Sequence, residues 1–158
     1  MKGIATVLAA LLGALLVALP AQSRVDAVED VLRTAGLLGT WAASCNAGPS
    51  RQNWFVTFYT TADGMVRRKS VRGGSDPTLD GTVDSADWVT PTMVRMRLRN
   101  DDPNWGDANG AIYDSVVEIR DGKSQALSSI RGDGAQLIKE GKFVASGTPT
   151  PIMQRCGN

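Results

Sequence analysis

The strongest constraint on the fold is a succession of short segments rich in aromatic and β-branched residues, separated by tight turn signals. After Gly36, about nine such segments follow at a spacing of roughly 8–12 residues, which is typical of an all-β barrel or sandwich. Residues 54–61 (WFVTFYTT) have strand composition, and residues 92–99 (TMVRMRLR) alternate between the two faces of a strand. Asp-Gly and Glu-Gly turns favour an antiparallel up-and-down order.

A meander of this many strands exposes two edges unless it closes on itself. Cys45 and Cys156 are the two cysteines of the chain, near the start and the end of the strand-rich region. In an oxidising compartment they are expected to form a disulfide, and in a closed meander the first and last strands are neighbours. A redox-active pair is the disfavoured alternative, because no Cys-x-x-Cys motif and no basic cluster would lower a thiol pKa.

One short helix is expected ahead of the strands, over residues 25–36 (VDAVEDVLRTAG). Val28 and Leu32 fall on one face of this segment. Acidic residues crowd its first turns and Arg33 lies near its end, which suits the helix dipole. Gly36 is a plausible stop signal.

The first 23 residues have the pattern of a signal peptide. Lys2 gives a positive start, residues 4–19 form an uncharged apolar run, and Pro20 breaks it. The small-x-small sequence Ala21-Gln22-Ser23 predicts cleavage after Ser23, and cleavage after Ala21 is the other candidate. An uncleaved anchor is disfavoured, because proline and small residues occupy the place where a span would continue. We therefore expect one soluble domain, residues 24–158, that is periplasmic or secreted and has no membrane span.

Composition excludes several classes of function. The chain of 158 residues fits one domain and contains no histidine, which removes Ser-His-Asp and Cys-His nucleophiles, His-ligated zinc and proximal-His haem. The formal net charge is +1, and loss of Lys2 with the leader makes the mature chain neutral, so no nucleic-acid partner is expected. We expect no catalytic residue, no metal, no cofactor and a monomer.

A family resemblance rests on three residues. Gly39 and Trp41 form a Gly-x-Trp sequence directly after the expected helix, and Arg155 lies in the last expected strand. This order resembles the lipocalins and related calycin β-barrels. The resemblance implies that Trp41 caps one end of a barrel and that Arg155 packs across it. The chain also resembles small secreted bacterial proteins with a Gly-Thr-Trp…Cys opening and a Thr-Pro…Cys ending, which implies a fold and a compartment but no activity.

The expected fold is therefore an all-β, antiparallel up-and-down barrel of about eight or nine strands with a short N-terminal helix. Its aromatic residues have two possible roles. In a chain this short they favour a filled or narrow interior, and the alternative is a ligand pocket. In the second interpretation Trp54, Phe58 and Tyr113 would form the pocket wall and Trp105 its mouth.

Three hypotheses for the function follow. The first, by analogy of fold, is a secreted or periplasmic non-enzymatic binding protein for a small, mostly apolar ligand. The alternative is an envelope module that binds an extracytoplasmic protein, for example as an inhibitor of a hydrolase, through residues 100–110 on a filled barrel. A hydrolase that uses acidic residues ranks below both.

Two charged segments have competing interpretations. Arg95, Arg97 and Arg99 share one strand face and, with residues 67–69, would form an anion-binding stripe. A solvated ladder is favoured instead, because acidic residues on the next strand are spaced to neutralise them. The loop 100–110 is rich in oxygen ligands for Ca²⁺, but it lacks the EF-hand spacing and closing Glu, so turn formation is favoured.

Overall fold

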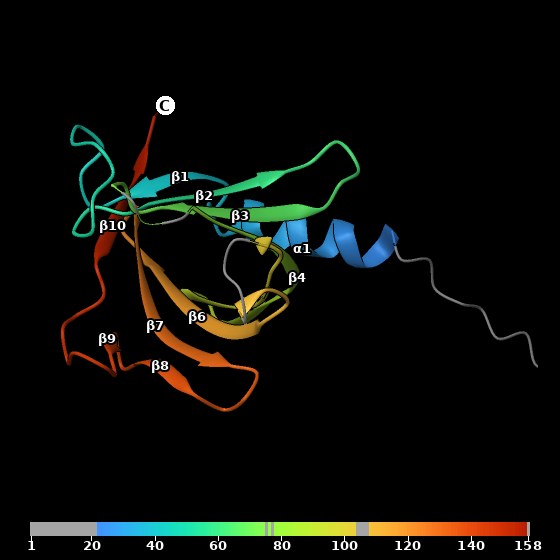
Figure 1. Cartoon of the computed structure of the whole chain (residues 1–158). Helices are drawn as coiled ribbons and strands as arrows, with labels where there is room; N and C mark the ends of the chain where they lie inside the picture. Colours follow the sequence, from blue (N-terminus) through green and yellow to red (C-terminus); the bar gives the residue numbers. More distant parts are fainter. Residues whose placement is uncertain (1–21, 75, 77, 104–107, 158) are drawn as a thin grey trace, which may run out of the picture.

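The computed structural model describes residues 22–74, 76, 78–103 and 108–157 (Figure 1). It confirms the all-β barrel with one short helix. In the described part of the chain the elements are α1 (Gln22–Thr34), β1 (Gly39–Ala42), β2 (Phe55–Thr60), β3 (Val66–Val71), β4 (Leu79–Thr90), β5 (Met93–Asn100), β6 (Ile112–Arg120), β7 (Lys123–Arg131), β8 (Gln136–Lys139), β9 (Lys142–Phe143) and β10 (Ile152–Cys156).

Residues 1–21 of the expected leader lie outside the described residues, so the signal peptide stays a prediction. Within the described ranges, no helix combines the length and the apolar character that crossing a membrane requires.

Eight strands close the barrel. Strands β1 to β7 follow one another in an antiparallel meander, and β10 lies between β7 and β1. Thr40 of β1 is opposite Cys156, and Gln125 of β7 is opposite Ile152. The first half of β7 pairs with β10 and its second half with β8, so the β8–β9 hairpin continues the wall beyond the ring (Figure 1). The expected up-and-down order is confirmed.

The expected disulfide is confirmed as well. Cys45 and Cys156 are bonded across a sequence separation of 111 residues. Cys156 is the last residue of β10, and Cys45 follows β1 by three positions. The bond therefore fastens the seam at which the two ends of the meander meet.

The helix fills one end of the barrel interior. Val28 and Leu32 of α1 are buried, at 5% and 0% exposure, and α1 packs against β3 and β4. Leu37 follows the helix and is 1% exposed. These side chains belong to the same apolar cluster as the inward-facing residues of the strands, such as Met96. The apolar face that the sequence predicts for the helix is thus the face that closes the barrel.

The strands predicted over residues 54–61 and 92–99 agree with β2 and β5 to within one residue at each end. Strand β4, over Leu79–Thr90, is less regular. Two register shifts, between Val83 and Ser85 and between Trp88 and Thr90, interrupt its alternation against β5. Such bulges place two residues opposite one and hide the period of two on which strand recognition depends.

Candidate functional site

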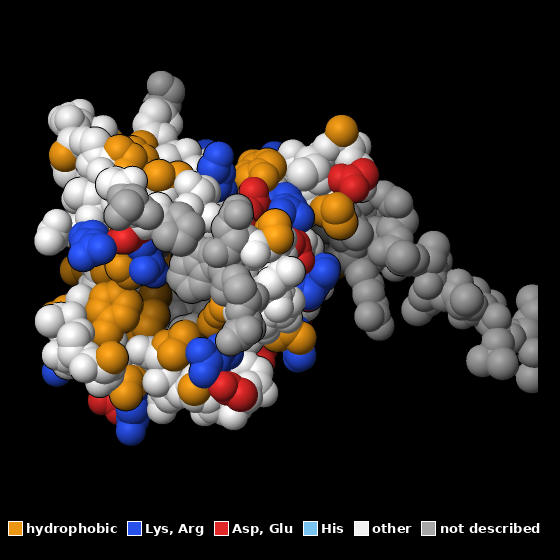
Figure 2. Space-filling view, in the orientation of Figure 1, with side chains coloured by type: hydrophobic (Ala, Val, Ile, Leu, Met, Phe, Trp, Pro, Cys, Tyr) orange, Lys and Arg blue, Asp and Glu red, His pale blue; other side chains and the backbone are white. Residues whose placement is uncertain are grey.

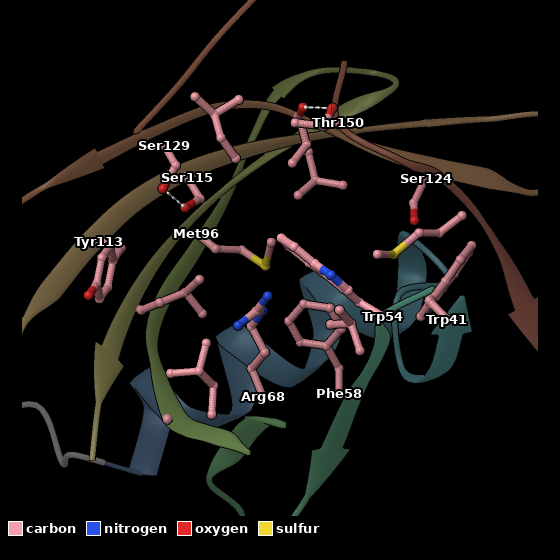
Figure 3. Close-up of a pocket in the computed structure, with 18 of the residues that line it drawn as sticks. Trp41, Trp54, Phe58, Arg68, Met96, Tyr113, Ser115, Ser124, Ser129 and Thr150 are labelled. Atoms are coloured by element: carbon pink, nitrogen blue, oxygen red, sulfur yellow. Dashed lines mark hydrogen bonds between the residues drawn. The ribbon is translucent and has the colours of Figure 1, made fainter. Parts of the chain in front are cut away.

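The interior of the barrel holds a cavity of about 350 Å³ (Figure 3). Pockets that bind small molecules measure roughly 300–1,000 Å³, so this one lies at the lower end of that range. Its wall is mainly aromatic and aliphatic and includes Trp41, Val56, Met96, Leu98 and Val117. The interior is therefore not filled, although a chain of this length favours filling.

Three of the four aromatic residues predicted to contact a ligand line this cavity. Phe58 reaches it from β2 and is 5% exposed, and Tyr113 reaches it from β6. Trp54 precedes β2 and also lines the wall. Trp105, predicted at the mouth, lies outside the described residues. That these residues bind a ligand stays a prediction, but their placement inside one cavity is a finding.

Contacts on several sides hold Trp54 in place. Its Nε1 donates a hydrogen bond of 2.6 Å to the carbonyl oxygen of Arg51. The guanidinium carbon of Arg72 lies 4.1 Å from the centroid of the indole, a cation–π distance. The ring of Phe143, from β9, lies 5.7 Å away between centroids. The indole is thus a fixed part of the wall, shared between the ring of strands and the extra hairpin.

The residues of the Gly-x-Trp resemblance lie together at the seam. Trp41 is 3% exposed, lines the cavity and donates its Nε1 hydrogen to the carbonyl of Leu37 at 2.9 Å. Arg155 is opposite Trp41 in the register of β1 and β10. A Cβ on Gly39 would lie 3.1 Å from Nε of Arg155, and Gly39 has a φ of +118°. Glycine at position 39 therefore fits both the backbone conformation and the close approach of the guanidinium.

Three basic residues of β3 divide between the two faces of the sheet. Arg67 lies on the outer face, where it forms ion pairs of 2.9 Å with Asp80 and 3.1 Å with Asp101. Arg68, one position later, is opposite Phe58 in the register and lines the cavity. Grouping Arg68 with Arg67 and Lys69 in one stripe is therefore wrong: Arg68 faces into the barrel, while the exposed Lys69 does not line the cavity.

The other half of the suggested stripe lies on the outer surface. Arg95, Arg97 and Arg99 are exposed, while Val94 and Met96 of the same strand are buried. Arg99 forms ion pairs of 3.1 Å with Asp84 and 3.2 Å with Asp101. Two of the outward arginines, Arg67 and Arg99, thus share Asp101 as a partner.

The Arg68 guanidinium has an unusual environment. Burial, together with the nearby positive charge of Arg72, lowers the pKa of Arg68 to about 10, so the group is still charged at neutral pH. Among the described residues, none forms a hydrogen bond or an ion pair with the Arg68 side chain. The sequence gives no signal for this residue, and it is the burial of Val66 and Ser70 on the same strand face in the structure that places Arg68 inward.

Hydroxyl groups form the polar part of the opposite wall. The Oγ atoms of Ser115 and Ser129 are 3.0 Å apart, and a hydrogen bond joins them (Figure 3). Thr150 donates its hydroxyl hydrogen toward the carbonyl oxygens of Ala126, at 2.8 Å, and Gly141, at 3.1 Å. These groups satisfy one another or the backbone, so none resembles an activated nucleophile.

Within the described residues, no three His, Cys, Asp or Glu side chains are grouped to hold a metal ion. Asp80 is the acidic residue among those that line the cavity, and Arg67 pairs with it. Four residues of the loop considered for Ca²⁺, residues 104–107, lie outside the described ranges.

Comparison of the chain with protein-family models, with curated proteins and with solved structures gives no match. The resemblance to the lipocalins therefore stays a prediction, and the site is interpreted from its own geometry.

Proposed function

We propose that this protein is a non-enzymatic binding protein that holds a small, mostly apolar ligand inside its barrel, in the periplasm or outside the cell. The observation that carries the proposal is the cavity of about 350 Å³ behind a wall of aromatic and aliphatic side chains. Figure 2 shows the same character from outside: hydrophobic side chains gather around a hollow in this face, with Lys or Arg side chains at its border.

The physical basis of such binding is the transfer of apolar surface from water. Each methylene group that enters the cavity contributes about 0.8 kcal/mol. The wall is already built from paired strands that the seam closes, so binding does not require the chain to fold around the ligand. A preformed apolar cavity in a closed barrel therefore suits a carrier or a sensor of small molecules.

The disulfide supports the proposed compartment. Structural disulfides persist in oxidising environments and are rare in the cytosol. The bond between Cys45 and Cys156 joins the two ends of the folded region, and the leader-like sequence of residues 1–23 agrees with export.

A second candidate is a protein-binding role for the loop 100–110. The base of this loop is anchored: Nδ2 of Asn100 donates to the carbonyl of Ala108 at 2.9 Å, and the Gly110 amide donates to the carbonyl of Asn100 at 2.7 Å. A loop with a fixed base suits recognition of a partner surface. The cavity favours the first candidate, because a scaffold for a loop needs no hollow interior.

Filling the cavity tests the first candidate. Ala126 is opposite Val117 in the register, and both line the cavity, so Ala126→Phe would occupy part of its volume. We expect at least tenfold weaker binding of the neutral fluorescent probe N-phenylnaphthylamine to purified residues 24–158. The control is Ala145→Phe, which makes the same change at an exposed position. Equal probe affinity in both folded variants would contradict binding inside the barrel.

A further inference from the structure

The inward face of β3 and the residue just after it carry polar groups that have no hydrogen-bond partner among the described residues. Arg68 and Ser70 are two positions apart in β3 and share its inward side, and Arg72, which follows the strand, lines the cavity as Arg68 does. Ser70 Oγ and Arg72 Nε are buried without a hydrogen-bond partner among the described residues. The guanidinium of Arg68 likewise forms no hydrogen bond or ion pair with any of them. Buried polar groups are normally satisfied, so these two exceptions, next to the unpaired guanidinium of Arg68, mark this face as a site for a missing partner.

The surroundings make room for the Arg68 side chain and direct it into the cavity. Its register neighbours are Phe58 on β2 and Gly81 on β4. A Cβ on Gly81 would lie 2.5 Å from the carbonyl oxygen of Arg99, so this position carries no side chain that would cover the guanidinium. Figure 3 shows the guanidinium directed into the cavity, beside Phe58 and toward Met96. The guanidinium of Arg68 is thus accessible to a ligand inside the cavity.

The carboxylates closest to this face are engaged elsewhere. Asp80 lines the cavity but pairs with Arg67 on the outer side at 2.9 Å. Asp76 accepts two hydrogen bonds from Arg51, at 3.2 and 3.0 Å. Burial lowers the pKa of Arg72, and Asp76 offsets only part of that effect. Two guanidinium groups therefore line an apolar cavity, and within the described ranges no carboxylate forms an ion pair with either of them.

We propose that the ligand is an amphiphile with one apolar chain and an anionic headgroup, and that Arg68 binds this headgroup inside the barrel, with Arg72 beside it. This inference rests on the proposed ligand-binding function and names its ligand class. A buried cation without a partner is unfavourable, and a carboxylate or phosphate satisfies a guanidinium fork through charge-assisted hydrogen bonds. The apolar chain would then lie against Met96, Leu98 and Val117.

The size of the cavity favours a single-chain ligand over a two-chain lipid. About 350 Å³ is near the lower limit for a small-molecule pocket. A fatty carboxylate is the simplest compound with this chemistry, and an alkyl phosphate shares it.

Matched ligands test the inference. Decanoate, decyl phosphate and decanol have the same chain length and differ in the charge and chemistry of the head. Each would compete with N-phenylnaphthylamine for delipidated residues 24–158 at pH 8, where both acids are ionised. We expect at least one of the two anions to bind tenfold or more tightly than decanol. The anion that binds more tightly assigns the headgroup to a carboxylate or to a phosphate.

Variants assign that preference to Arg68. Arg68→Met removes the charge and keeps an unbranched chain, so the preference for the anion should fall to less than threefold while decanol still binds. Arg68→Lys should retain part of the preference. Arg95→Met is the matched control on the exposed outer face of β5 and should leave it unchanged.

Three results would overturn the inference. If decanol and both anions bind the wild-type protein equally and all displace the probe, the headgroup site is refuted while the apolar binding function stands. If Arg68→Met loses decanol and the anion to the same extent, Arg68 has a structural role instead. If neither the probe nor any of the three ligands binds, the proposed function fails together with the inference.

Discussion

At the scale of single residues, the buried positive charge of Arg68 favours the binding of an anion and disfavours the folding of the ligand-free chain. Its pKa is lowered to about 10 from its ordinary value, first by burial and then by Arg72, so folding disfavours its charged form. The unfolded chain holds this proton more tightly. The penalty is therefore fully present at neutral pH and decreases only as the pH rises above about 10.

Arg68→Met should for this reason stabilise the ligand-free protein. We expect the free energy of unfolding to rise by about 1–3 kcal/mol, because an apolar side chain of similar length replaces a buried cation that has no partner in the described part of the chain. Urea unfolding of delipidated protein at pH 7 measures this change. The exposed control Arg95→Met should stay within about 0.5 kcal/mol of the wild type. A less stable Arg68→Met protein would show that the guanidinium already contributes to the fold.

The inward orientation of Arg68 cannot be predicted from the sequence alone. Strand faces are assigned when one face is apolar and the other polar, as in Val94, Met96 and Leu98 of β5. Residues 66–72 (VRRKSVR) carry polar groups on both faces, so the pattern does not show which side is buried. Only the register with Phe58 places Arg68 in the cavity. The aromatic residues of the wall were easier to predict, because large apolar side chains in strands tend to be buried.

At the scale of elements, one carboxylate ties the strands β3, β4 and β5 to the loop that follows β5. Asp101 accepts from Arg67 at 3.1 Å and from Arg99 at 3.2 Å, and it also accepts from the hydroxyl of Thr82. Its side chain is 22% exposed, so solvent screens these contacts only in part. Networks of this kind contribute more than isolated surface pairs.

Asp101→Asn should therefore destabilise the protein by about 1–2 kcal/mol, since two arginines lose a shared anionic partner. Thermal and urea unfolding at low salt would measure the loss, and added salt should reduce the difference from the wild type. Asp114→Asn, on the exposed face of β6, is the matched control. A change in Asp101→Asn no larger than in this control would mean that the network contributes nothing measurable.

The β8–β9 hairpin is fastened to the barrel through Thr150. The Thr150 hydroxyl points to the carbonyls of Ala126 on β7 and Gly141 in the hairpin turn, and its amide donates to Gly141 at 2.8 Å. Thr150 is 3% exposed, so water does not readily replace the hydrogen bonds of its hydroxyl. Leu137, Ile138 and Phe143 of the hairpin line the cavity.

Thr150→Val keeps the shape of this side chain and removes its hydroxyl. We expect a loss of about 1–2 kcal/mol in stability and faster hydrogen exchange in β8 and β9 than elsewhere. Because the hairpin forms part of the cavity wall, the affinity for N-phenylnaphthylamine should fall as well. Thr148→Val, at an exposed position of the same connection, is the control. Unchanged exchange in the hairpin would contradict the anchoring role.

The ends of the strands are easier to predict from the sequence than the neighbours with which each strand pairs. Turn residues such as Asp121-Gly122 and Glu140-Gly141 set the ends of the strands, because their positive φ values suit tight hairpins. The same local signals do not show that β7 divides its edge between β8 and β10, since that division depends on contacts distant in the sequence. The bulges of β4 are likewise not visible in the sequence, because they arise from the pairing of β4 with β5.

At the scale of the whole molecule, the cavity exists only while the seam between β10 and β1 stays closed. Strand β10 has three register pairs with β1 and three with β7, fewer than the long pairings of β4, β5 and β6. The disulfide lies at the end of this short strand. Closure of the barrel therefore depends on a weak strand that a covalent bond reinforces.

Replacing both cysteines by serine should destabilise the protein by about 4–5 kcal/mol, because the cross-link closes a loop of 111 residues in the unfolded chain. The seam should also open locally, so amide hydrogens of β10 and β1 should exchange faster while those of β5 and β6 change only with global stability. Faster opening predicts faster release of bound N-phenylnaphthylamine from the double variant, measured by stopped flow under conditions in which both proteins are folded. Reduction of the wild-type protein with dithiothreitol is the matched control and should reproduce all three effects. A stability loss below about 1 kcal/mol, or release at the wild-type rate, would show that the strands alone hold the barrel shut.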